Sequence, residues 1–224
     1  MSPTPGGAAL LLDLDGTLLD TAPDMAAALN ALLREERGET LPFESIRPQV
    51  SHGAAGLVRL AFGAVAEAEA HRLRRRFVLI YRESLSAGTR MFPGFEAVLG
   101  TLEGRGTPWG IVTNKPAWLT TPLLAELGLA GRPACVVCGD TLPERKPHPA
   151  PLLHAATLIG IAPERCLYVG DAERDIVAGR AAGMRTVAVR FGYLGADEDP
   201  AVWAPDEIVA TPGELLAFLG TGGA

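Results

Sequence analysis

Short runs of consecutive apolar residues recur along the chain and predict strands that are buried on both faces. Runs without polar alternation are typical of parallel sheets, which helices cover on each side. The predicted strands span residues 8–12, 109–112, 134–138, 166–169 and 186–189. Four of these five runs stop at polar residues that could take part in chemistry, beginning with Asp13 after the first run.

Between the predicted strands, apolar residues recur at the spacing of an amphipathic helix. The predicted helices span residues 95–102, 118–127, 151–159 and 175–182. Strands that alternate with helices favour an α/β fold with a doubly wound, mostly parallel, Rossmann-like sheet. Ligands bind such sheets at the carboxyl ends of the strands, so the polar residues there are candidates for a functional site.

The segment between the first strand and residue 86 departs from this alternation, since it contains no recognisable strand pattern. Thr21-Ala22-Pro23 is a favourable helix start, and an apolar stripe with helical spacing follows it. Further helices are predicted over residues 56–62 and 67–81. We therefore expect an α/β core domain of residues 1–17 and 87–224, with an all-helical domain of residues 18–86 inserted after the first strand.

The composition narrows the classes of partner. The 224 residues are 48% hydrophobic and 21% charged, as in folded globular proteins. A formal net charge of -6 argues against nucleic acid as the main partner, because phosphate backbones select basic surfaces. No apolar run approaches the roughly 20 residues of a membrane helix. The three cysteines do not suggest a disulfide framework, so we expect a cytoplasmic protein; the sequence does not indicate its oligomeric state.

Asp13 and Asp15 are the first candidates for chemistry. If the strand continues through both, its period of two puts their side chains on one side, and Gly16 then allows a sharp turn. Two carboxylates there suit a metal, or a nucleophile beside a general acid/base. The alternative is an ordinary Asp-Gly turn without chemistry.

Asp171 and Asp175 form a second acidic pair, which follows another apolar strand. Their spacing spans a strand end and a helix start, so both could face one point. With Asp13 they provide three carboxylates, a set of hard oxygen ligands typical of Mg²⁺. The alternative for Asp175 is a role at the helix terminus, where acidic residues are favoured.

Two further segments could bind phosphate. Thr113-Asn114 follows the second predicted strand of the core, where a hydroxyl and free backbone N–H groups could hold phosphate oxygens. Lys146 lies in a loop before Pro147, and by itself it is compatible with simple surface charge. It gains interest because several predicted strand ends bring anionic groups to the same edge of the sheet.

These motifs together resemble the haloacid dehalogenase superfamily in their order and spacing. The likeness rests on Asp13-Leu14-Asp15-Gly16-Thr17, Thr113-Asn114, Lys146-Pro147, Gly170-Asp171 and Asp175. Within the superfamily, the chain is most similar to phosphoglycolate phosphatases and to a branch that acts on N-acetylmuramic acid 6-phosphate. Residues 18–24, 51–54, 109–116 and 191–193 carry this closer likeness. The resemblance implies that the helical insertion is a cap domain.

The resemblance also implies a phosphatase that acts on a small phosphorylated metabolite. Asp13 would attack phosphorus and become phosphorylated. Asp15 would protonate the leaving alcohol and then take a proton from the hydrolytic water. Thr113 and the backbone of Asn114 would hold the phosphoryl oxygens, while Lys146 neutralises Asp13 and the phosphate. Such roles agree with phosphoryl transfer, which depends mainly on positioning and charge stabilisation.

The implied cofactor is Mg²⁺. Asp171 would bind it beside Asp13 and the backbone carbonyl of Asp15, and Asp175 would support it directly or through water. Many relatives have Ser or Thr after the first acidic residue of this motif, whereas this chain has Ala172. One hydroxyl contact to the metal site is therefore expected to be missing.

Other segments are weighed against plainer interpretations. The resemblance suggests that Ser51, His52 and Gly53 form a cap loop that touches the substrate; the alternative is a plain loop. Cys135 and Cys138 would point to opposite faces of one strand, so we interpret them as core residues rather than as a zinc or redox pair. The basic run over residues 71–76 is interpreted as a solvated helix face rather than a nucleic-acid site.

Three other functions compete with a phosphatase. A phosphosugar mutase on the same scaffold would keep both Asp13 and Asp15. A dehalogenase would not need Asp15, because a halide leaves without a proton. A non-catalytic, phospho-accepting signalling domain would need neither the second aspartate nor a helical insertion.

Overall fold

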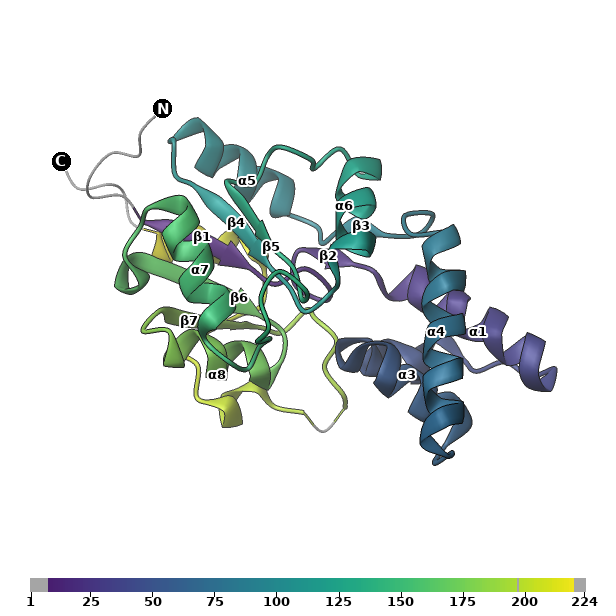
Figure 1. The fold of residues 1–224 in the computed structure, drawn as a ribbon. Helices are drawn as coiled ribbons and strands as arrows, with labels where there is room; N and C mark the ends of the chain where they lie inside the picture. Colours follow the sequence, from purple (N-terminus) through teal and green to yellow (C-terminus); the bar gives the residue numbers. More distant parts are fainter. Residues whose placement is uncertain (1–7, 197, 220–224) are drawn as a thin grey trace.

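The computed structural model describes residues 8–196 and 198–219, which form a layered α/β core with a group of helices beside it (Figure 1). Residues 1–7, 197 and 220–224 of the predicted core domain lie outside the described residues. The core contains a six-stranded sheet in the order β5-β4-β1-β6-β7-β8, and every neighbouring pair is parallel. These strands are β1 (Ala9–Leu12), β4 (Trp109–Val112), β5 (Cys135–Val137), β6 (Cys166–Gly170), β7 (Arg185–Val189) and β8 (Glu207–Val209).

The five predicted strands all exist, and β8 adds an edge strand that the apolar pattern did not predict. Successive residues of β1 face opposite sides of the sheet. Leu10 and Leu12 belong to a core cluster with α5 and α6, while Ala9 and Leu11 pack in a second cluster with α7 and α8. The helices of the core are α5 (Phe95–Gly104), α6 (Ala117–Glu126), α7 (Ala150–Ile159), α8 (Glu173–Ala181) and α9 (Leu215–Phe218). The prediction of a doubly wound parallel sheet is therefore confirmed.

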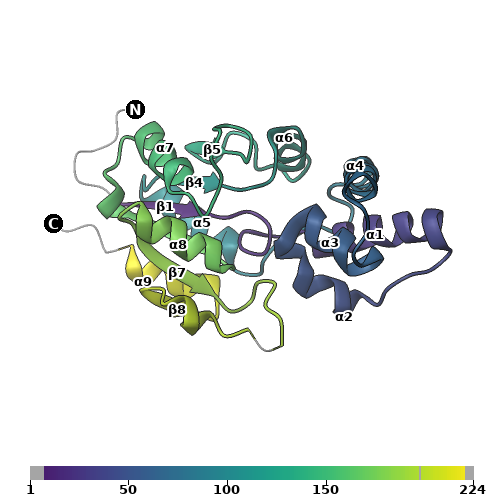
Figure 2. The ribbon, with the colours of Figure 1, turned by 60° about the horizontal axis from the view of Figure 1, so that its bottom comes forward.

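The helical lobe, which we define as α1 to α4, leaves the core after β1 and lies to one side of the sheet (Figure 2). Its helices are α1 (Ala22–Arg37), α2 (Phe43–Ile46), α3 (Gly53–Phe62) and α4 (Glu67–Glu83), and the short 3₁₀ helix η1 (Arg47–His52) joins α2 to α3. Other 3₁₀ turns are η2 (Pro163–Arg165), η3 (Pro200–Trp203) and η4 (Pro212–Glu214).

An antiparallel pair of two-residue strands, β2 (Leu19–Asp20) and β3 (Arg90–Met91), marks where the chain enters and leaves the helical lobe. The prediction that the inserted segment holds no strand is thus wrong at β2. Two residues are too short to show alternation, and the pairing with β3 depends on a contact between distant parts of the chain.

The helical lobe packs through an apolar interior and exposes an ion-paired surface. Leu29 of α1 and Phe77 of α4 are completely buried in the cluster that also contains Leu10 of the sheet. On the exposed face, Arg72 contacts Glu36 at 2.7 Å, and Arg74 and Arg76 form similar pairs with glutamates. The basic run is therefore a solvated helix face, as the sequence predicted.

The cysteines and the hydropathy of the helices agree with the sequence interpretation. Cys135 lies in β5 and Cys138 follows it, and both thiols are buried and free. Burial raises the pKa of the Cys135 thiol to about 11, so this side chain behaves as a core residue rather than as a thiolate ligand. Among the described residues, no helix has the length and apolar character needed to cross a membrane.

Candidate active site

Three adjacent strands bring their carboxyl ends to one point. β1 lies between β4 and β6 in the sheet. Asp13 follows β1, Thr113 follows β4 and Asp171 follows β6. From β1, strands β4 and β5 extend the sheet on one side and strands β6, β7 and β8 extend it on the other. Doubly wound folds bind ligands at this point of the sheet, where the strand order reverses. A cavity of about 500 Å³ opens above Asp13, and its wall includes Val50 and Phe77 of the helical lobe.

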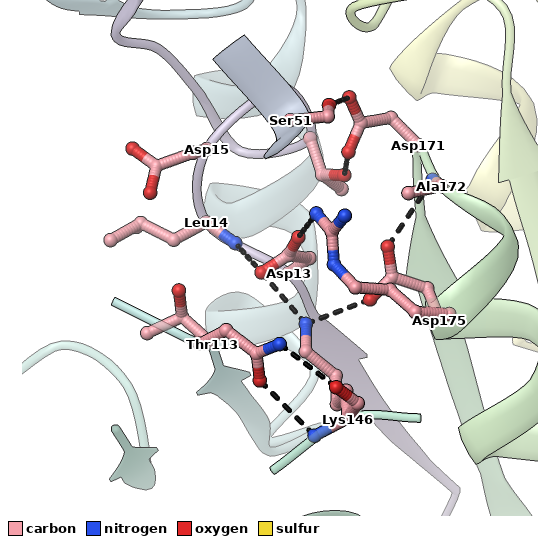
Figure 3. A network of polar contacts seen from close by, with 12 residues as sticks. Asp13, Leu14, Asp15, Ser51, Thr113, Lys146, Asp171, Ala172 and Asp175 are labelled. Atoms are coloured by element: carbon pink, nitrogen blue, oxygen red, sulfur yellow. Dashed lines mark hydrogen bonds and ion pairs between the residues drawn. The ribbon is translucent and has the colours of Figure 1, made fainter. Parts of the chain in front are cut away.

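Asp13 is buried and held beside a lysine. Its carboxylate accepts a hydrogen bond from the backbone N–H of Leu14 at 2.7 Å, and the Nζ of Lys146 lies 2.8 Å from Oδ1 (Figure 3). The guanidinium of Arg174 lies 4.0 Å from Oδ2. Burial raises the pKa of Asp13 above its usual value, Lys146 opposes this effect, and Asp175 adds to it. The carboxylate faces the cavity, where it can approach a ligand.

Lys146 is the hub of the buried network. Its ammonium also contacts Oδ1 of Asp175 at 2.8 Å, the carbonyl of Val112 at 2.8 Å and the hydroxyl of Tyr168 at 2.7 Å. Only 1% of the Lys146 side chain is exposed, so these partners replace its hydration. The alternative of a simple surface charge for Lys146 is therefore excluded.

Asp175 has two roles in this network. Its Oδ2 accepts a hydrogen bond from the backbone N–H of Ala172 at 3.2 Å, so it does serve the start of α8. Its other oxygen faces Lys146. Asp175 therefore has the role at the helix terminus that the sequence analysis gave as the alternative, and its other oxygen pairs with Lys146.

Asp13, Asp171 and Asp175 form a buried carboxylate cluster, in which one oxygen of each lies within 4.8 Å of the others. Burial, and after it the charges of Asp13 and Asp175, raise the pKa of Asp171 to about 7. Three buried carboxylates beside Lys146 and Arg174 leave an excess of negative charge. Hard oxygen ligands in this arrangement fit a divalent cation such as Mg²⁺, which would relieve that repulsion.

The carboxylate of Asp171 is oriented by groups from distant segments. Ser51 of the helical lobe donates to Oδ2 at 2.8 Å, the backbone N–H of Tyr193 donates to it at 3.0 Å, and Thr17 lies 3.5 Å from Oδ1. Two hydroxyls, those of Ser51 and Thr17, therefore lie beside this carboxylate although residue 172 is alanine. Gly16 passes so close to Asp171 that a Cβ there would collide with the carboxylate, and its φ of 85° also favours glycine.

Thr113 and Asn114 occupy the end of β4. Thr113 is 3% exposed and faces the cavity, while its Oγ1 accepts a hydrogen bond from the backbone N–H of Lys115 at 3.1 Å. The side chain of Asn114 pairs with the backbone of Lys146, donating to its carbonyl at 2.9 Å and accepting from its N–H at 3.1 Å. Asn114 therefore fixes the loop that carries Lys146, a role that the sequence did not suggest.

Asp15 differs from the expectation that both aspartates lie on one side of a strand. β1 ends at Leu12, and Asp15 follows in a turn. Its carboxylate points away from Asp13 and Lys146 (Figure 3). It accepts hydrogen bonds from Thr21 at 2.7 Å and from the ammonium of Lys115 at 2.9 Å. The period-two argument fails because the extended backbone stops before the second aspartate.

The structure also places the segment from Ser51 to Gly53, which lines the cavity with His52 exposed. Sequence reasoning missed Lys115, Tyr81 and Arg174. Lys115 and Arg174 are each adjacent in sequence to a predicted site residue, and that proximity was the one available signal. Tyr81 gave no signal, because aromatic residues in an amphipathic helix normally belong to the core.

The comparison with protein families agrees with this geometry. A family model described as haloacid dehalogenase-like hydrolase matches residues 10–189. The chain belongs to this haloacid dehalogenase-like hydrolase family. The segment contains the carboxylate cluster, Lys146 and the whole helical lobe. The resemblance that the sequence motifs indicated is thereby confirmed.

Individual relatives of this haloacid dehalogenase-like hydrolase are phosphatases. A phosphoglycolate phosphatase of Xanthomonas campestris pv. campestris is 47% identical over 207 residues, which cover 92% of this chain and 94% of that protein. An N-acetylmuramic acid 6-phosphate phosphatase of Pseudomonas aeruginosa is 41% identical over 212 residues, or 94% of each chain. These similarities confirm the prediction of a phosphatase.

A solved structure shows the same fold. The crystal structure of a protein from Haemophilus somnus, described as a predicted phosphoglycolate phosphatase, superposes with a TM-score of 0.85 at 28% identity. The match covers 97% of this haloacid dehalogenase-like hydrolase and 100% of that chain. The α/β sheet and the helical lobe therefore recur together in a relative of distant sequence.

Proposed function

We propose that the protein is a Mg²⁺-dependent phosphatase that hydrolyses a small phosphorylated metabolite through an aspartyl-phosphate on Asp13. The observation that carries this proposal is the position of Asp13. Its carboxylate faces the cavity, contacts Lys146 at 2.8 Å and shares a buried cluster with Asp171 and Asp175. With the positive charges of Lys146 and of a Mg²⁺ ion held by the cluster beside it, this carboxylate could approach an anionic ester without prohibitive repulsion.

The first half of the reaction makes the covalent intermediate. An oxygen of Asp13 bonds to phosphorus while the bond from phosphorus to the leaving oxygen breaks. Asp15, as a carboxylic acid, gives its proton to that oxygen, and the alcohol departs. Lys146 neutralises Asp13 and the transferring phosphoryl group, and Thr113 with the backbone of Asn114 holds phosphoryl oxygens.

The second half of the reaction releases phosphate. A water attacks phosphorus, the Asp15 carboxylate takes the proton of that water, and the bond to Asp13 breaks. Asp13, Asp171, Asp175 and the backbone carbonyl of Asp15 would hold Mg²⁺, which supplies positive charge for the equatorial phosphoryl oxygens. The reaction consumes one water. Asp15 is protonated again at the end, because it has taken a proton from that water in place of the one it gave to the alcohol.

The helical lobe acts as the cap of the site in this proposal. Ser51, His52 and Gly53 line the cavity, and Ser51 reaches the cluster through Asp171. A lid over the cavity excludes bulk water while the phosphoenzyme forms. We therefore assign residues 18–86 as the cap domain and residues 1–17 and 87–224 as the core domain.

The proposed substrate is 2-phosphoglycolate, on the strength of the relative that is 47% identical over nearly the whole chain. The cavity supports a second candidate, N-acetylmuramic acid 6-phosphate. A volume of about 500 Å³ with an apolar wall that includes Val50, Phe77 and Val78 leaves room for a sugar ring beyond the phosphate. The relative that is 41% identical has that activity.

The deciding experiment measures phosphate release from a panel of phosphorylated metabolites, with Mg²⁺ and after removal of metal by a chelator. The panel includes 2-phosphoglycolate and N-acetylmuramic acid 6-phosphate. We expect metal-dependent release and a preference for one of these two. The absence of metal-dependent release from any member would overturn the proposal, and phosphate that moves within a sugar without being released would identify a mutase.

We also propose a cellular location. The three cysteines are free thiols in the structure, as is usual in a reducing compartment. We assign the protein to the cytoplasm, where small phosphorylated metabolites are present. Fractionation of the source cells followed by immunodetection tests this assignment.

A further inference from the structure

We propose that Lys115 is a positioning residue which, together with Tyr81 of the helical lobe, holds the carboxylate of Asp15 for proton transfer. The inference rests on the proposed function, in which Asp15 exchanges protons with the leaving alcohol and with water. It adds two residues to that function, and one of them belongs to the lobe rather than to the core.

The carboxylate of Asp15 is held by two side chains. Its Oδ1 accepts hydrogen bonds from Oγ1 of Thr21 at 2.7 Å and from Nζ of Lys115 at 2.9 Å, and its Oδ2 lies 3.3 Å from the same Nζ. The side chain of Asp15 is 20% exposed and lines the cavity, so it is available to a ligand there. The position of this carboxylate therefore depends on where Lys115 lies.

Lys115 in turn depends on Tyr81. The hydroxyl of Tyr81 lies 3.0 Å from Nζ of Lys115, and the ammonium also lies 4.6 Å from the centre of the tyrosine ring. The side chain of Lys115 is only 5% exposed, so Asp15 and Tyr81 take the place of water around its charge.

The contacts of Lys115 define its part. Its ammonium donates hydrogen bonds to the carboxylate of Asp15 at 2.9 Å and to the hydroxyl of Tyr81 at 3.0 Å, so its part in this proposal is to orient Asp15.

The contacts from Tyr81 to Lys115 and from Lys115 to Asp15 connect the helical lobe with the core. Tyr81 lies in α4 and is 1% exposed, whereas Asp15 and Lys115 follow β1 and β4 of the sheet. Lys146 occupies the other side of the site, against Asp13 and Asp175. The two lysines thus have separate tasks, since Lys146 faces the nucleophile and Lys115 faces the acid/base.

The dependence on the leaving group distinguishes this role from simple substrate binding. The quotient kcat/KM reports transition-state stabilisation relative to free enzyme and substrate, up to the first irreversible step. An alkyl phosphate needs a proton on its leaving oxygen in that step. p-Nitrophenyl phosphate does not need one, because its phenolate is a stable leaving group. A residue that acts through Asp15 affects the alkyl ester selectively.

The test compares Tyr81→Phe and Lys115→Met with the unchanged protein, using the best alkyl phosphate of the panel and p-nitrophenyl phosphate. Tyr81→Phe removes one hydroxyl and keeps the ring that stacks on Phe77, so we expect this variant to fold. General acid catalysis typically contributes about 10²–10⁴-fold. We expect kcat/KM for the alkyl ester to fall about 100-fold in Lys115→Met, at the lower end of that contribution, and about 10-fold in Tyr81→Phe, which acts only through Lys115. For p-nitrophenyl phosphate we expect changes of less than about 3-fold, since that contribution is not needed.

Leu79→Ala is the matched control, because Leu79 lies in the same helix, is 50% exposed and is not among the residues that line the cavity. Its kcat/KM should be nearly unchanged for both esters. The proposal would be overturned if Tyr81→Phe and Lys115→Met lowered kcat/KM equally for both esters, or if they left kcat/KM for the alkyl ester unchanged. Failure of the proposed function has a different signature, since the unchanged protein would then release phosphate from neither ester.

Discussion

The hydroxyl of Ser51 donates a hydrogen bond of 2.8 Å to Oδ2 of Asp171, although 120 residues separate the two along the chain. Ser51 belongs to the helical lobe, and Asp171 follows the central strand β6. The bond joins the proposed cap directly to the carboxylate cluster.

The first prediction concerns this bond. In metal-free protein, Ser51→Ala should lower the free energy of unfolding by about 1 kcal/mol, because Asp171 loses one of its donors. With Mg²⁺ the loss should shrink, since the cation then neutralises the carboxylate. Urea unfolding with and without Mg²⁺ measures the effect. Ser45→Ala, which removes an exposed hydroxyl of the same lobe, is the control and should respond equally in both conditions. A metal-independent loss in Ser51→Ala would refute this account.

The second prediction is a pH dependence of stability in metal-free protein. Burial and the charges of Asp13 and Asp175 raise the pKa of Asp171 from 3.8 to about 7. Between these values the folded state holds a proton that the unfolded chain has released. The free energy of unfolding should therefore decrease as the pH rises through this range, by up to ~1.4 kcal/mol per pH unit from this group. Thermal melts between pH 5 and 8 in chelator measure this slope.

Asp171→Asn is the matched variant for that slope, since the amide keeps the shape and removes the titration. Its melting temperature should depend less on pH than that of the unchanged protein, and it should not rise when Mg²⁺ is added. An identical pH slope in the two proteins would show that Asp171 does not carry the effect.

The third prediction concerns Lys146, whose ammonium lies 2.8 Å from both Asp13 and Asp175. Lys146→Met leaves two buried carboxylates without their partner, so the free energy of unfolding should fall by about 3–5 kcal/mol without metal. Phosphate release should fall by at least roughly 10²–10³-fold. Arg145→Met removes a neighbouring, exposed charge and should leave the melting temperature nearly unchanged. Equal stability of the two variants would contradict the assigned network.

The fourth prediction separates the two aspartates of the first motif. Asp13→Asn should abolish turnover, by roughly 10³-fold or more, and form no phosphoenzyme. Its fold should persist, because Lys146 keeps Asp175 as a partner. Asp15→Asn should still accept phosphate from p-nitrophenyl phosphate but hydrolyse the adduct slowly, so that it accumulates. Acid quenching followed by mass spectrometry detects the adduct. Turnover by Asp13→Asn, or no adduct in Asp15→Asn, would show that the roles are assigned wrongly.

The parts that the sequence predicted well are those with a local cause. Runs of apolar residues are visible in any short window, and they located β1, β4, β5, β6 and β7. Parallel strands bring their carboxyl ends to one edge, which is why Asp13 and Asp171 were expected to meet and do meet. The strands β2 and β3 were not predicted because two residues form no pattern, and β8 was not predicted because the charged Glu207 interrupts its apolar character.

The errors concern the direction of individual side chains. Asp13 and Asp15 line one cavity, but not because a strand continues through both, since β1 ends at Leu12 and the chain then turns. For Lys146, the sequence left a solvated surface charge open as the alternative to a role in the site, and only the structure excludes that alternative by burying the side chain. In both cases a residue from a distant segment decides the outcome, since Lys115 draws Asp15 away and Asn114 fixes the backbone of Lys146.

The sequence by itself thus determined the α/β fold, the family and the set of acidic residues at the strand ends, because local hydrophobic patterns and motif order specify these. Only the tertiary structure decided which groups surround each carboxylate. Ser51 and Tyr81 reach the site from the helical lobe, and their contacts depend on how the lobe packs against the sheet. Burial then sets the strength of each interaction, and burial is a property of the packed molecule rather than of any single segment.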